Sequence, residues 1–303
     1  MAPTKTNEDA RNLLTLSPAI VAGSAGGFGR LFMRDLQAEG LRVEGVDLVA
    51  GHEGSHVADI GAPSSSLSDL LQQCSLLLLC VPEEAAFRAL EHAVPLLPSG
   101  ALVVDLMSVK SPVMKCYKMM RQDIEVVSIN PMFAPDLGWS AQQVGVVEVQ
   151  SGVRSSAFLQ MLRTWEVLPM RMSAEEHDRQ TAFTQVVVHA ALLALGLAAS
   201  KLNYDAQSAL LTPPARAMLT LLARIATKEP GVYFHIQSDH PKASEARALL
   251  AEALAEVDRT ARLGTIDDFA KMLQRAASSL GGAKERLAME SAASLHKASE
   301  ATR

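Results

Sequence analysis

The sequence predicts an α/β fold: a doubly wound, Rossmann-type parallel sheet followed by an all-α helical dimerisation domain. Three observations predict this. An apolar run near the N-terminus breaks into glycines and then into a helical pattern. Unbroken apolar runs then recur at the spacing of buried parallel strands, with helical patterns between them. From residue 174 onward the pattern becomes that of long helices rich in alanine and leucine.

The glycine-rich segment follows the strand Ile20–Ala22 and opens a helix that ends at Gly40. In the dinucleotide-binding pattern G-x-G-x-x-G the first glycine is a serine here. The second glycine lets the backbone approach the phosphates, the third lets helix and strand pack closely, and the helix N-terminus favours a pyrophosphate. We therefore assign cofactor binding to Ser24, Gly26, Gly27, Phe28 and Gly29.

The next strand, Arg42–Asp47, ends in an acidic residue about 20 residues beyond the glycines, as recognition of a ribose 2′-hydroxyl requires. Asp47 would repel a 2′-phosphate, so the predicted cofactor is NAD rather than NADP. Val81 and Pro82 end another buried strand. They complete the predicted cofactor set because strand ends face the ligand crevice of such sheets.

The remaining elements follow in order along the chain. The expected strands are a short one near Ala58–Ile60, then Leu76–Pro82, Ala101–Asp105, Glu125–Asn130, Val144–Val149 and Met170–Met172. The expected helices between them are Glu83–Val94, Pro112–Met120 and Ser155–Trp165. Long helices are expected over 174–201, 206–228 and 243–299, with Thr212-Pro213-Pro214 as a breaker.

These patterns predict three segments: a lead-in over 1–17, an NAD-binding Rossmann domain over 18–173, and a helical substrate and dimerisation domain over 174–303. The helical domain is too apolar, from Ala190 to Ala199 in particular, for one subunit to bury. We therefore expect a homodimer that pairs through this domain.

Composition excludes several classes of protein. The formal charge of −5 and the isoelectric point near 5.9 argue against nucleic acid as a partner. The three cysteines have no metal-ligand spacing, so we expect free thiols and no metal. We expect no apolar run near the length of a membrane span and no signal peptide. The composition therefore predicts a cytoplasmic protein that does not bind a membrane.

Two polar clusters follow neighbouring strands and are candidates for chemistry. Ser108 and Lys110 follow the strand that ends at Asp105, and Asn130 begins the segment Asn130-Pro131-Met132-Phe133-Ala134-Pro135-Asp136. Because the carboxyl ends of parallel strands face the ligand crevice, Ser108 and Lys110 are placed to meet nicotinamide and substrate. The alternative is a helix cap and a surface lysine.

Several motifs, taken in their order along the chain, resemble the prephenate dehydrogenase family. They are Gly26–Phe32, Asp105–Lys110, Asn130–Asp136, Glu176-His177-Asp178, Gln185 and His189. The resemblance runs from about residue 18 to beyond 230. It implies oxidation of prephenate by NAD, with hydride leaving ring carbon 4 while the ring carboxylate leaves as CO2.

The resemblance also implies roles for single residues. Ser108 matches a serine that holds the catalytic group and a substrate oxygen, and Lys110 matches a substrate-binding lysine. His189 matches an active-site histidine on the first long helix, and Arg224 matches the arginine that binds a substrate carboxylate. Arg216 is a second candidate for that carboxylate. The segment Glu176-His177-Asp178 is expected to cap the long helix and order the domain junction, without a catalytic role.

One position departs from the family: Asn130 stands where its relatives have histidine. That histidine accepts the proton of the substrate's 4-hydroxyl, a contribution of roughly 10²–10⁴-fold. Asparagine cannot accept a proton. An amine at carbon 4 does not need the base, because its lone pair expels hydride directly. Family members resembling this chain act on 4-amino-4-deoxyprephenate in antibiotic pathways, and the resemblance therefore implies that substrate.

Three alternatives remain open. The first is a prephenate or arogenate dehydrogenase of tyrosine synthesis in which His189 or a water replaces the missing base. The second is a non-catalytic dinucleotide-sensing protein, although such a protein has no need of Ser108, Lys110, His189 and Arg224. The third is a β-hydroxyacid or imine reductase of the same architecture, whose families place a lysine or aspartate on the long helix.

Overall fold

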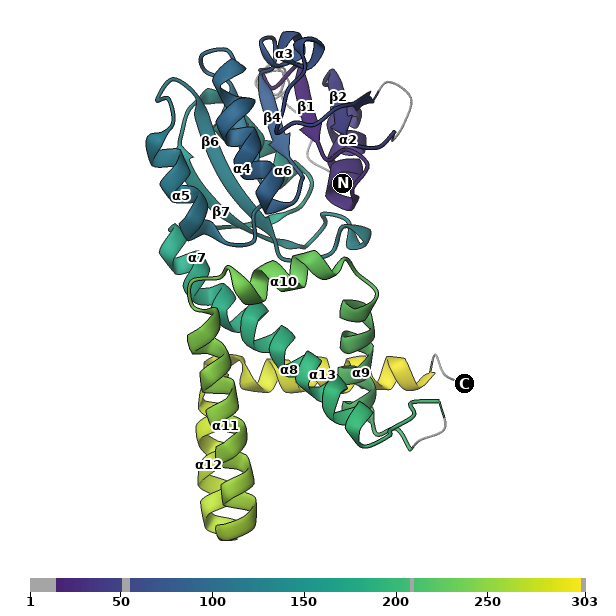
Figure 1. Ribbon diagram of the computed structural model, residues 1–303. Helices are drawn as coiled ribbons and strands as arrows, with labels where there is room; N and C mark the ends of the chain where they lie inside the picture. Colours follow the sequence, from purple (N-terminus) through teal and green to yellow (C-terminus); the bar gives the residue numbers. More distant parts are fainter. Residues whose placement is uncertain (1–14, 51–54, 208–209, 301–303) are drawn as a thin grey trace. The chain divides into compact units, whose positions relative to one another are not determined.

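The structure is a computed structural model that describes residues 15–50, 55–207 and 210–300 (Figure 1). Residues 1–14 of the predicted lead-in lie outside these ranges. The described residues up to Arg179 form one compact unit, and those from Gln180 onward form a second. The boundary predicted after Ser173 coincides with the start of helix α7 (Ala174–Thr181), whereas the two units divide inside that helix.

The first unit is built on an eight-stranded sheet with the order β3-β2-β1-β4-β5-β6-β7-β8. Its strands are β1 (Ala19–Ala22), β2 (Val43–Asp47), β3 (His56–Val57), β4 (Leu76–Leu79), β5 (Leu102–Asp105), β6 (Glu125–Pro131), β7 (Gln143–Gln150) and β8 (Leu168–Arg171). The strands from β3 to β6 are parallel. The order places the ends of β1, β2 and β4 side by side, which is where the candidate cofactor site lies.

The parallel sheet predicted from the sequence needs one correction, because β7 runs antiparallel to β6. The two strands are joined by residues 132–142, whose only helical piece is a 3₁₀ turn, Pro135–Leu137. A parallel neighbour requires a crossover of a dozen or more residues, usually a helix, so this short connection returns the chain in the opposite direction. β8 then pairs parallel to β7.

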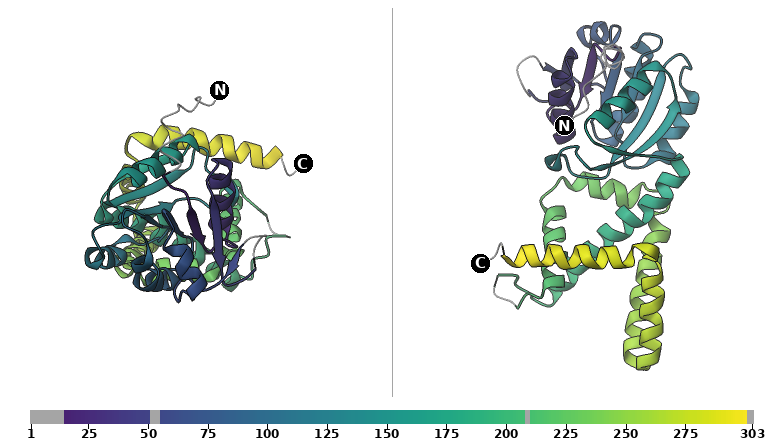
Figure 2. Two further views of the ribbon diagram at one scale, coloured as in Figure 1. Left: turned by 90° about the horizontal axis from the view of Figure 1, so that it is seen from above. Right: turned by 180° about the vertical axis from the view of Figure 1, so that it is seen from behind.

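Helices cover both faces of the sheet, as Figures 1 and 2 show. Residues of β4 alternate between two cores: Leu76 and Leu78 lie in one, and Leu77 and Leu79 in the other. This strand is therefore buried on both faces, as its unbroken run of leucines predicts. Two helices cover one face and three the other: α2 (Gly27–Ala38) and α6 (Val153–Thr164), against α3 (Ser65–Leu71), α4 (Glu83–His92) and α5 (Lys110–Met119).

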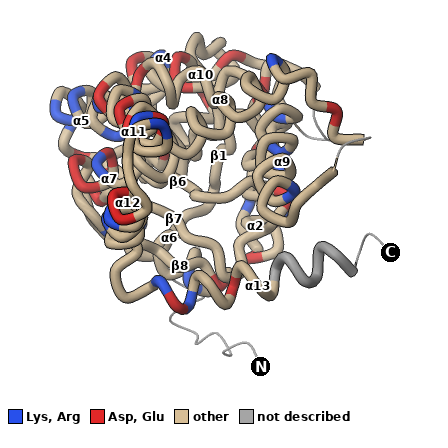
Figure 3. The backbone as a smooth tube through the Cα atoms, turned by 90° about the horizontal axis from the view of Figure 1, so that it is seen from below, with Lys and Arg blue, Asp and Glu red and all other residues tan. Residues whose placement is uncertain are grey.

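The second unit consists of helices. They are the end of α7, a π-helical turn (Ala182–Val187), α8 (Val188–Lys201), α9 (Pro213–Ala226), α10 (Pro230–Ser238), α11 (Ala243–Leu263), α12 (Ile266–Ser278) and α13 (Lys284–Glu300). A Cβ atom on Gly196 would lie 2.8 Å from Leu222 Cδ2, so glycine permits the close packing of α8 on α9. Charged residues of both signs occur along α11 and α12 (Figure 3), and Arg275 pairs with Glu256 between these helices.

Two expectations for the helices are corrected. The helix expected over 206–228 begins only at Pro213, because Thr212 is its N-cap and accepts a hydrogen bond from Ala215 N at 3.4 Å. Proline suits the first helical position because its missing N–H has no helical partner there. The Thr-Pro-Pro breaker therefore starts a helix, and α10 was not predicted.

One helical stretch of the described chain, Ala174–Lys201, is long and apolar enough to cross a membrane by length and composition alone. No such run was expected from the sequence, and this expectation is corrected. A mostly buried core helix of a soluble protein passes the same test, but only 11% of this apolar window is buried.

Candidate active site

The turn between β1 and α2 is shaped by glycines. Gly23 has a positive φ of +77°, and a Cβ atom there would lie 2.2 Å from the Cys80 carbonyl oxygen. A Cβ atom on Gly29 would lie only 1.9 Å from the Gly23 carbonyl oxygen. The strand and the helix can therefore approach this closely only with glycine at both positions.

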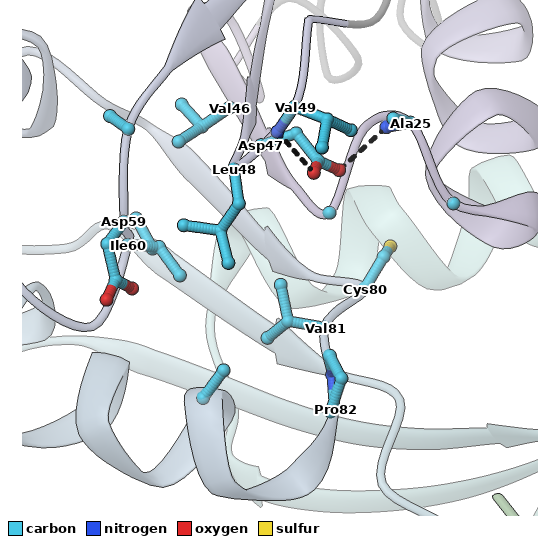
Figure 4. Close-up of a pocket in the computed structure, with 14 residues that line it drawn as sticks. Ala25, Val46, Asp47, Leu48, Val49, Asp59, Ile60, Cys80, Val81 and Pro82 are labelled. Carbon is cyan, nitrogen blue, oxygen red and sulfur yellow. Dashed lines mark hydrogen bonds between the residues drawn. The ribbon is translucent and has the colours of Figure 1, made fainter. Parts of the chain in front are cut away.

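A pocket of about 320 Å³ opens beside this turn (Figure 4). Gly26 and Asp47 line one side, and Val81 and Pro82 line another. Asp47 Oδ2 accepts a hydrogen bond from Ala25 N at 2.9 Å, so the carboxylate at the end of β2 is tied to the glycine turn. The pocket thus combines the helix N-terminus, the acidic strand end and an apolar wall expected of a dinucleotide site.

The other predicted cofactor residues lie around the pocket rather than in its lining. Gly27 faces the loop after β6, since a Cβ atom there would lie 2.5 Å from Pro135 Cγ. The ring of Phe28 packs against Phe133 and Trp139, with ring centroids 5.5 Å and 6.2 Å apart. The side chain of Phe28 is therefore a packing element. Its backbone N–H, in the first turn of α2, is the group available to a cofactor.

The residues present fit the pyrophosphate of a dinucleotide. The first amides of α2 have no carbonyl partner within the helix, and the macrodipole favours an anion there. Ser24 is fully buried, and its Oγ has no hydrogen-bond partner among the residues that the structure describes. Buried hydroxyls are nearly always paired, so an unpaired one beside a helix N-terminus suits a ligand oxygen.

Replacing Asp47 by asparagine is expected to raise the use of NADP relative to NAD by about tenfold, which corresponds to about 1.4 kcal/mol. The substitution keeps the side chain's size and removes the charge that repels a 2′-phosphate. The measurement is kcat/KM for both cofactors, with the exposed Asp69→Asn as the control. An unchanged cofactor ratio in the Asp47 variant would contradict the role of this carboxylate.

Lys110 is not among the residues that line the cofactor pocket, and its expected role in substrate binding stays a prediction. Its side chain is fully buried, and Nζ donates to Met107 O at 2.6 Å and to Ile129 O at 2.7 Å. Nζ also lies 3.5 Å from Asp105 Oδ1. Burial lowers the pKa of Lys110, and the Asp105 carboxylate opposes that shift. The ammonium group joins the ends of β5 and β6 and is enclosed by protein.

Ser108 is half-buried, and its side chain has no hydrogen-bond partner among the described residues. Asp105 is the centre of a buried hydrogen-bond network beside Ser108. It accepts from Met107 N at 2.9 Å, Ser128 Oγ at 2.9 Å and Tyr117 Oη at 2.5 Å. This network fixes the strand end on which Ser108 stands.

Asn130 lies near the end of β6 and is 3% exposed. Its Nδ2 atom is 3.1 Å from His177 Nε2, and His177 Nδ1 is 3.0 Å from Asp178 Oδ1. Asp178 accepts in turn from Lys110 N at 2.9 Å and Ser111 N at 2.8 Å, the first amides of α5. The sequence expectation that His177 and Asp178 cap the long helix is therefore corrected: Asp178 caps α5, and His177 contacts Asn130.

In the second unit, the structure brings His189 and Arg224 near one further residue, Tyr233 of α10. The rings of His189 and Tyr233 meet edge to face with centroids 5.1 Å apart. Arg224 acts on Tyr233 electrostatically, lowering a pKa that burial raises. His189 Nδ1 is buried and has no hydrogen-bond partner within the described part of the chain, and burial lowers the pKa of its ring. Arg216 lies half-buried on the same helix as Arg224.

Tyr233 was missed because α10 was not predicted. The signal that could have found it is Pro230, which opens this helix at its first position.

The glycine turn, its pocket and the acidic end of β2 define a dinucleotide-dependent oxidoreductase. Residues 32–149 match the family model described as the nucleotide-binding domain of prephenate dehydrogenase. The chain is 34% identical over 286 residues to the 4-amino-4-deoxyprephenate dehydrogenase of Streptomyces pristinaespiralis, covering 91% of this chain and 97% of that protein. The chain belongs to the prephenate dehydrogenase family.

Further relatives agree with this assignment. The chain is 28% identical over 243 residues to the T-protein of Enterobacter agglomerans, covering 78% of this chain and 61% of the T-protein. Among solved structures, prephenate dehydrogenase from Aquifex aeolicus in complex with hydroxyphenyl propionate and NAD+ has the same fold. Its TM-score is 0.68 at 15% identity, over 86% of this chain and 96% of that one.

These findings confirm the predicted family, the Rossmann-type sheet followed by helices, and an NAD-dependent dehydrogenase.

Proposed function

We propose that this protein oxidises 4-amino-4-deoxyprephenate with NAD, forming 4-aminophenylpyruvate, CO2 and NADH. The observation that carries the proposal is Asn130, an amide at the strand end where the family places a proton-accepting histidine. The relative named 4-amino-4-deoxyprephenate dehydrogenase supports the same substrate. Antibiotic biosynthesis is the process in which such a substrate is consumed.

The reaction balances without a base at residue 130. The substrate's C4–H bond breaks and its electron pair leaves as hydride, while the amino lone pair forms a double bond to C4. The bond from C1 to the carboxylate then breaks, CO2 leaves, and its electron pair completes the aromatic ring and returns the lone pair to nitrogen. The nitrogen keeps both of its protons throughout. When bound, NAD supplies the hydride acceptor.

Residues of the chain bind the cofactor and hold the substrate. The pocket at the glycine turn holds the cofactor, Asn130 contacts the amino group, and Ser108 binds a substrate oxygen. In the helical unit, Arg224 binds a substrate carboxylate, with Arg216 as the second cation. A guanidinium suits this role because it donates two parallel hydrogen bonds to one carboxylate. His189, whose ring nitrogen is unpaired in the described structure, orients the same substrate.

We also propose that the protein is a cytoplasmic homodimer that pairs through its helical unit and binds neither membrane nor nucleic acid. Large apolar side chains are exposed on two of its helices: Leu197 of α8 is 66% exposed, and Leu254 and Leu263 of α11 are 67% and 77% exposed. Apolar surface of this kind favours a covering partner, and self-association is the commonest arrangement.

The proposal is tested by mixing the purified protein with NAD and 4-amino-4-deoxyprephenate and following NADH at 340 nm. We expect NADH, CO2 and 4-aminophenylpyruvate in equal amounts. NADH from prephenate or arogenate alone would instead favour a dehydrogenase of tyrosine synthesis. An absence of NADH with every substrate would favour a dinucleotide-sensing protein, provided that NAD binding is measured in the same sample.

A further inference from the structure

We propose that His177 is a positioning residue that fixes the rotation of the Asn130 amide, so that the amide oxygen faces the substituent on substrate carbon 4. The inference rests on the proposed function for the identity of that substituent. It gives the hydrogen-bonded side chains of Asn130, His177 and Asp178 a role in orienting the substrate, which neither the family resemblance nor the cofactor site requires.

The Asp178 carboxylate is held as an acceptor from several sides. Lys110 N and Ser111 N donate to its two oxygens at 2.9 Å and 2.8 Å, and Ser111 Oγ donates to Oδ2 at 2.5 Å. Burial alone would raise the pKa of Asp178, but the hydrogen bonds from His177, Ser111 and the α5 amides outweigh it and hold the pKa at about 2. The carboxylate is therefore ionised and can only accept hydrogen bonds.

This acceptor decides where His177 carries its proton. Its Nδ1 atom lies 3.0 Å from Asp178 Oδ1, so Nδ1 must be the donor. Burial and the Lys110 ammonium lower the pKa of His177, while Asp178 and Asp105 oppose them, and the net shift is downward. The ring is accordingly neutral near pH 7, and its Nε2 atom is a hydrogen-bond acceptor.

Nε2 then decides which way the amide of Asn130 is turned. The amide atom 3.1 Å from Nε2 must be a donor, and only the nitrogen, Nδ2, can donate. A Cβ atom on Gly145, which pairs with Asn130 across the sheet, would lie 3.0 Å from His177 Cδ2. The glycine thus leaves the space that the imidazole occupies.

The amide oxygen is left at the other end of the side chain. Oδ1 has no hydrogen-bond partner among the described residues. It is also absent from the set of unpaired polar atoms that these residues bury completely. It therefore retains some contact with solvent and can accept a hydrogen bond from a ligand.

The rotation of the Asn130 amide affects a substrate with an amine on carbon 4 more than one with a hydroxyl there. A neutral amine has a single lone pair, and that pair must stay free to expel hydride. An oxygen acceptor takes an N–H of the amine and leaves the lone pair free, whereas an N–H donor would occupy it. A hydroxyl oxygen has two lone pairs and can accept one hydrogen bond without losing the other. Fixing the amide oxygen toward the substrate therefore favours the amine.

The test compares two substitutions of His177. His177→Asn keeps a donor near Asp178 but leaves nothing at the position of Nε2, whereas His177→Gln places an amide oxygen there. We expect the asparagine variant to lower the ratio of kcat/KM for 4-amino-4-deoxyprephenate over prephenate by roughly threefold to tenfold, the effect of one hydrogen bond. The glutamine variant should restore part of this ratio. The exposed His92→Asn serves as the control.

A second measurement needs no variant and no substrate. Nitrogen NMR of the histidine-labelled protein should show His177 as the neutral tautomer protonated on Nδ1. A charged ring, or a proton on Nε2, would overturn the inference because the amide of Asn130 would then be turned the other way. The two proposals fail separately. A wild-type protein that prefers prephenate defeats the proposed function, while an amine-selective protein whose ratio is unchanged in His177→Asn defeats only this inference.

Discussion

Replacing Asn130 by histidine is expected to raise kcat/KM for prephenate by roughly 10²-fold, the lower end of the range for a positioned general base. Histidine at this strand end supplies the proton acceptor that the amide lacks. The turnover of 4-amino-4-deoxyprephenate should not rise, because its reaction needs no base there. The measurement is steady-state NADH formation from both substrates by the variant and the wild type.

Asn130→Ala is the matched control, since it removes the amide without adding a base. It should leave the turnover of prephenate no higher than that of the wild type. If histidine at residue 130 leaves the prephenate rate unchanged, then some other group already acts as the base. His189 or a water would be that group, and the protein would be a dehydrogenase of tyrosine synthesis.

Lys110→Met is expected to destabilise the protein by about 3–5 kcal/mol, because it leaves the buried Asp105 carboxylate without its cation. Two strand-end carbonyls, those of Met107 and Ile129, would lose their donor at the same time. The measurement is the free energy of unfolding from urea denaturation. The KM for substrate should change little in protein that remains folded, since the ammonium group is fully buried and its hydrogen bonds go to backbone carbonyls.

Lys118→Met, an exposed lysine of the same helix, should have almost no effect on unfolding. The double variant Asp105→Asn with Lys110→Met should recover part of the loss, because it removes the unpaired charge. A Lys110 variant as stable as the wild type but with a strongly raised KM would instead favour the substrate-binding role expected from the family.

The elements that the sequence predicted well are those whose pattern is local. The run Leu76–Leu79 is buried on both faces because four successive apolar residues leave no polar side to expose. The turn between β1 and α2 is similarly evident because its glycines are required by contacts with nearby backbone. The direction of β7 was not predictable in this way. It depends on a connection without an α-helix, and the residues of that loop gave no sign of its path.

The same distinction between local and long-range features applies to the residues of the candidate site. Asp47 and Asn130 could be found from the sequence because each ends a strand whose pattern is clear. The contact between Asn130 and His177 joins residues 47 positions apart, and that between Lys110 and Asp178 joins residues 68 positions apart. The periodicity of apolar residues in a sequence does not predict hydrogen bonds between residues so far apart. The enclosure of Lys110 was missed for this reason, because the sequence does not show which carbonyl groups surround a lysine that follows a strand.

The most direct measurement is a competition in which the wild-type protein meets equal concentrations of 4-amino-4-deoxyprephenate and prephenate with limiting NAD. The product ratio, read by chromatography, equals the ratio of the two kcat/KM values and is insensitive to the amount of active protein. An amide in place of the family's base predicts 4-aminophenylpyruvate as the dominant product. A mixture dominated by 4-hydroxyphenylpyruvate would contradict the account.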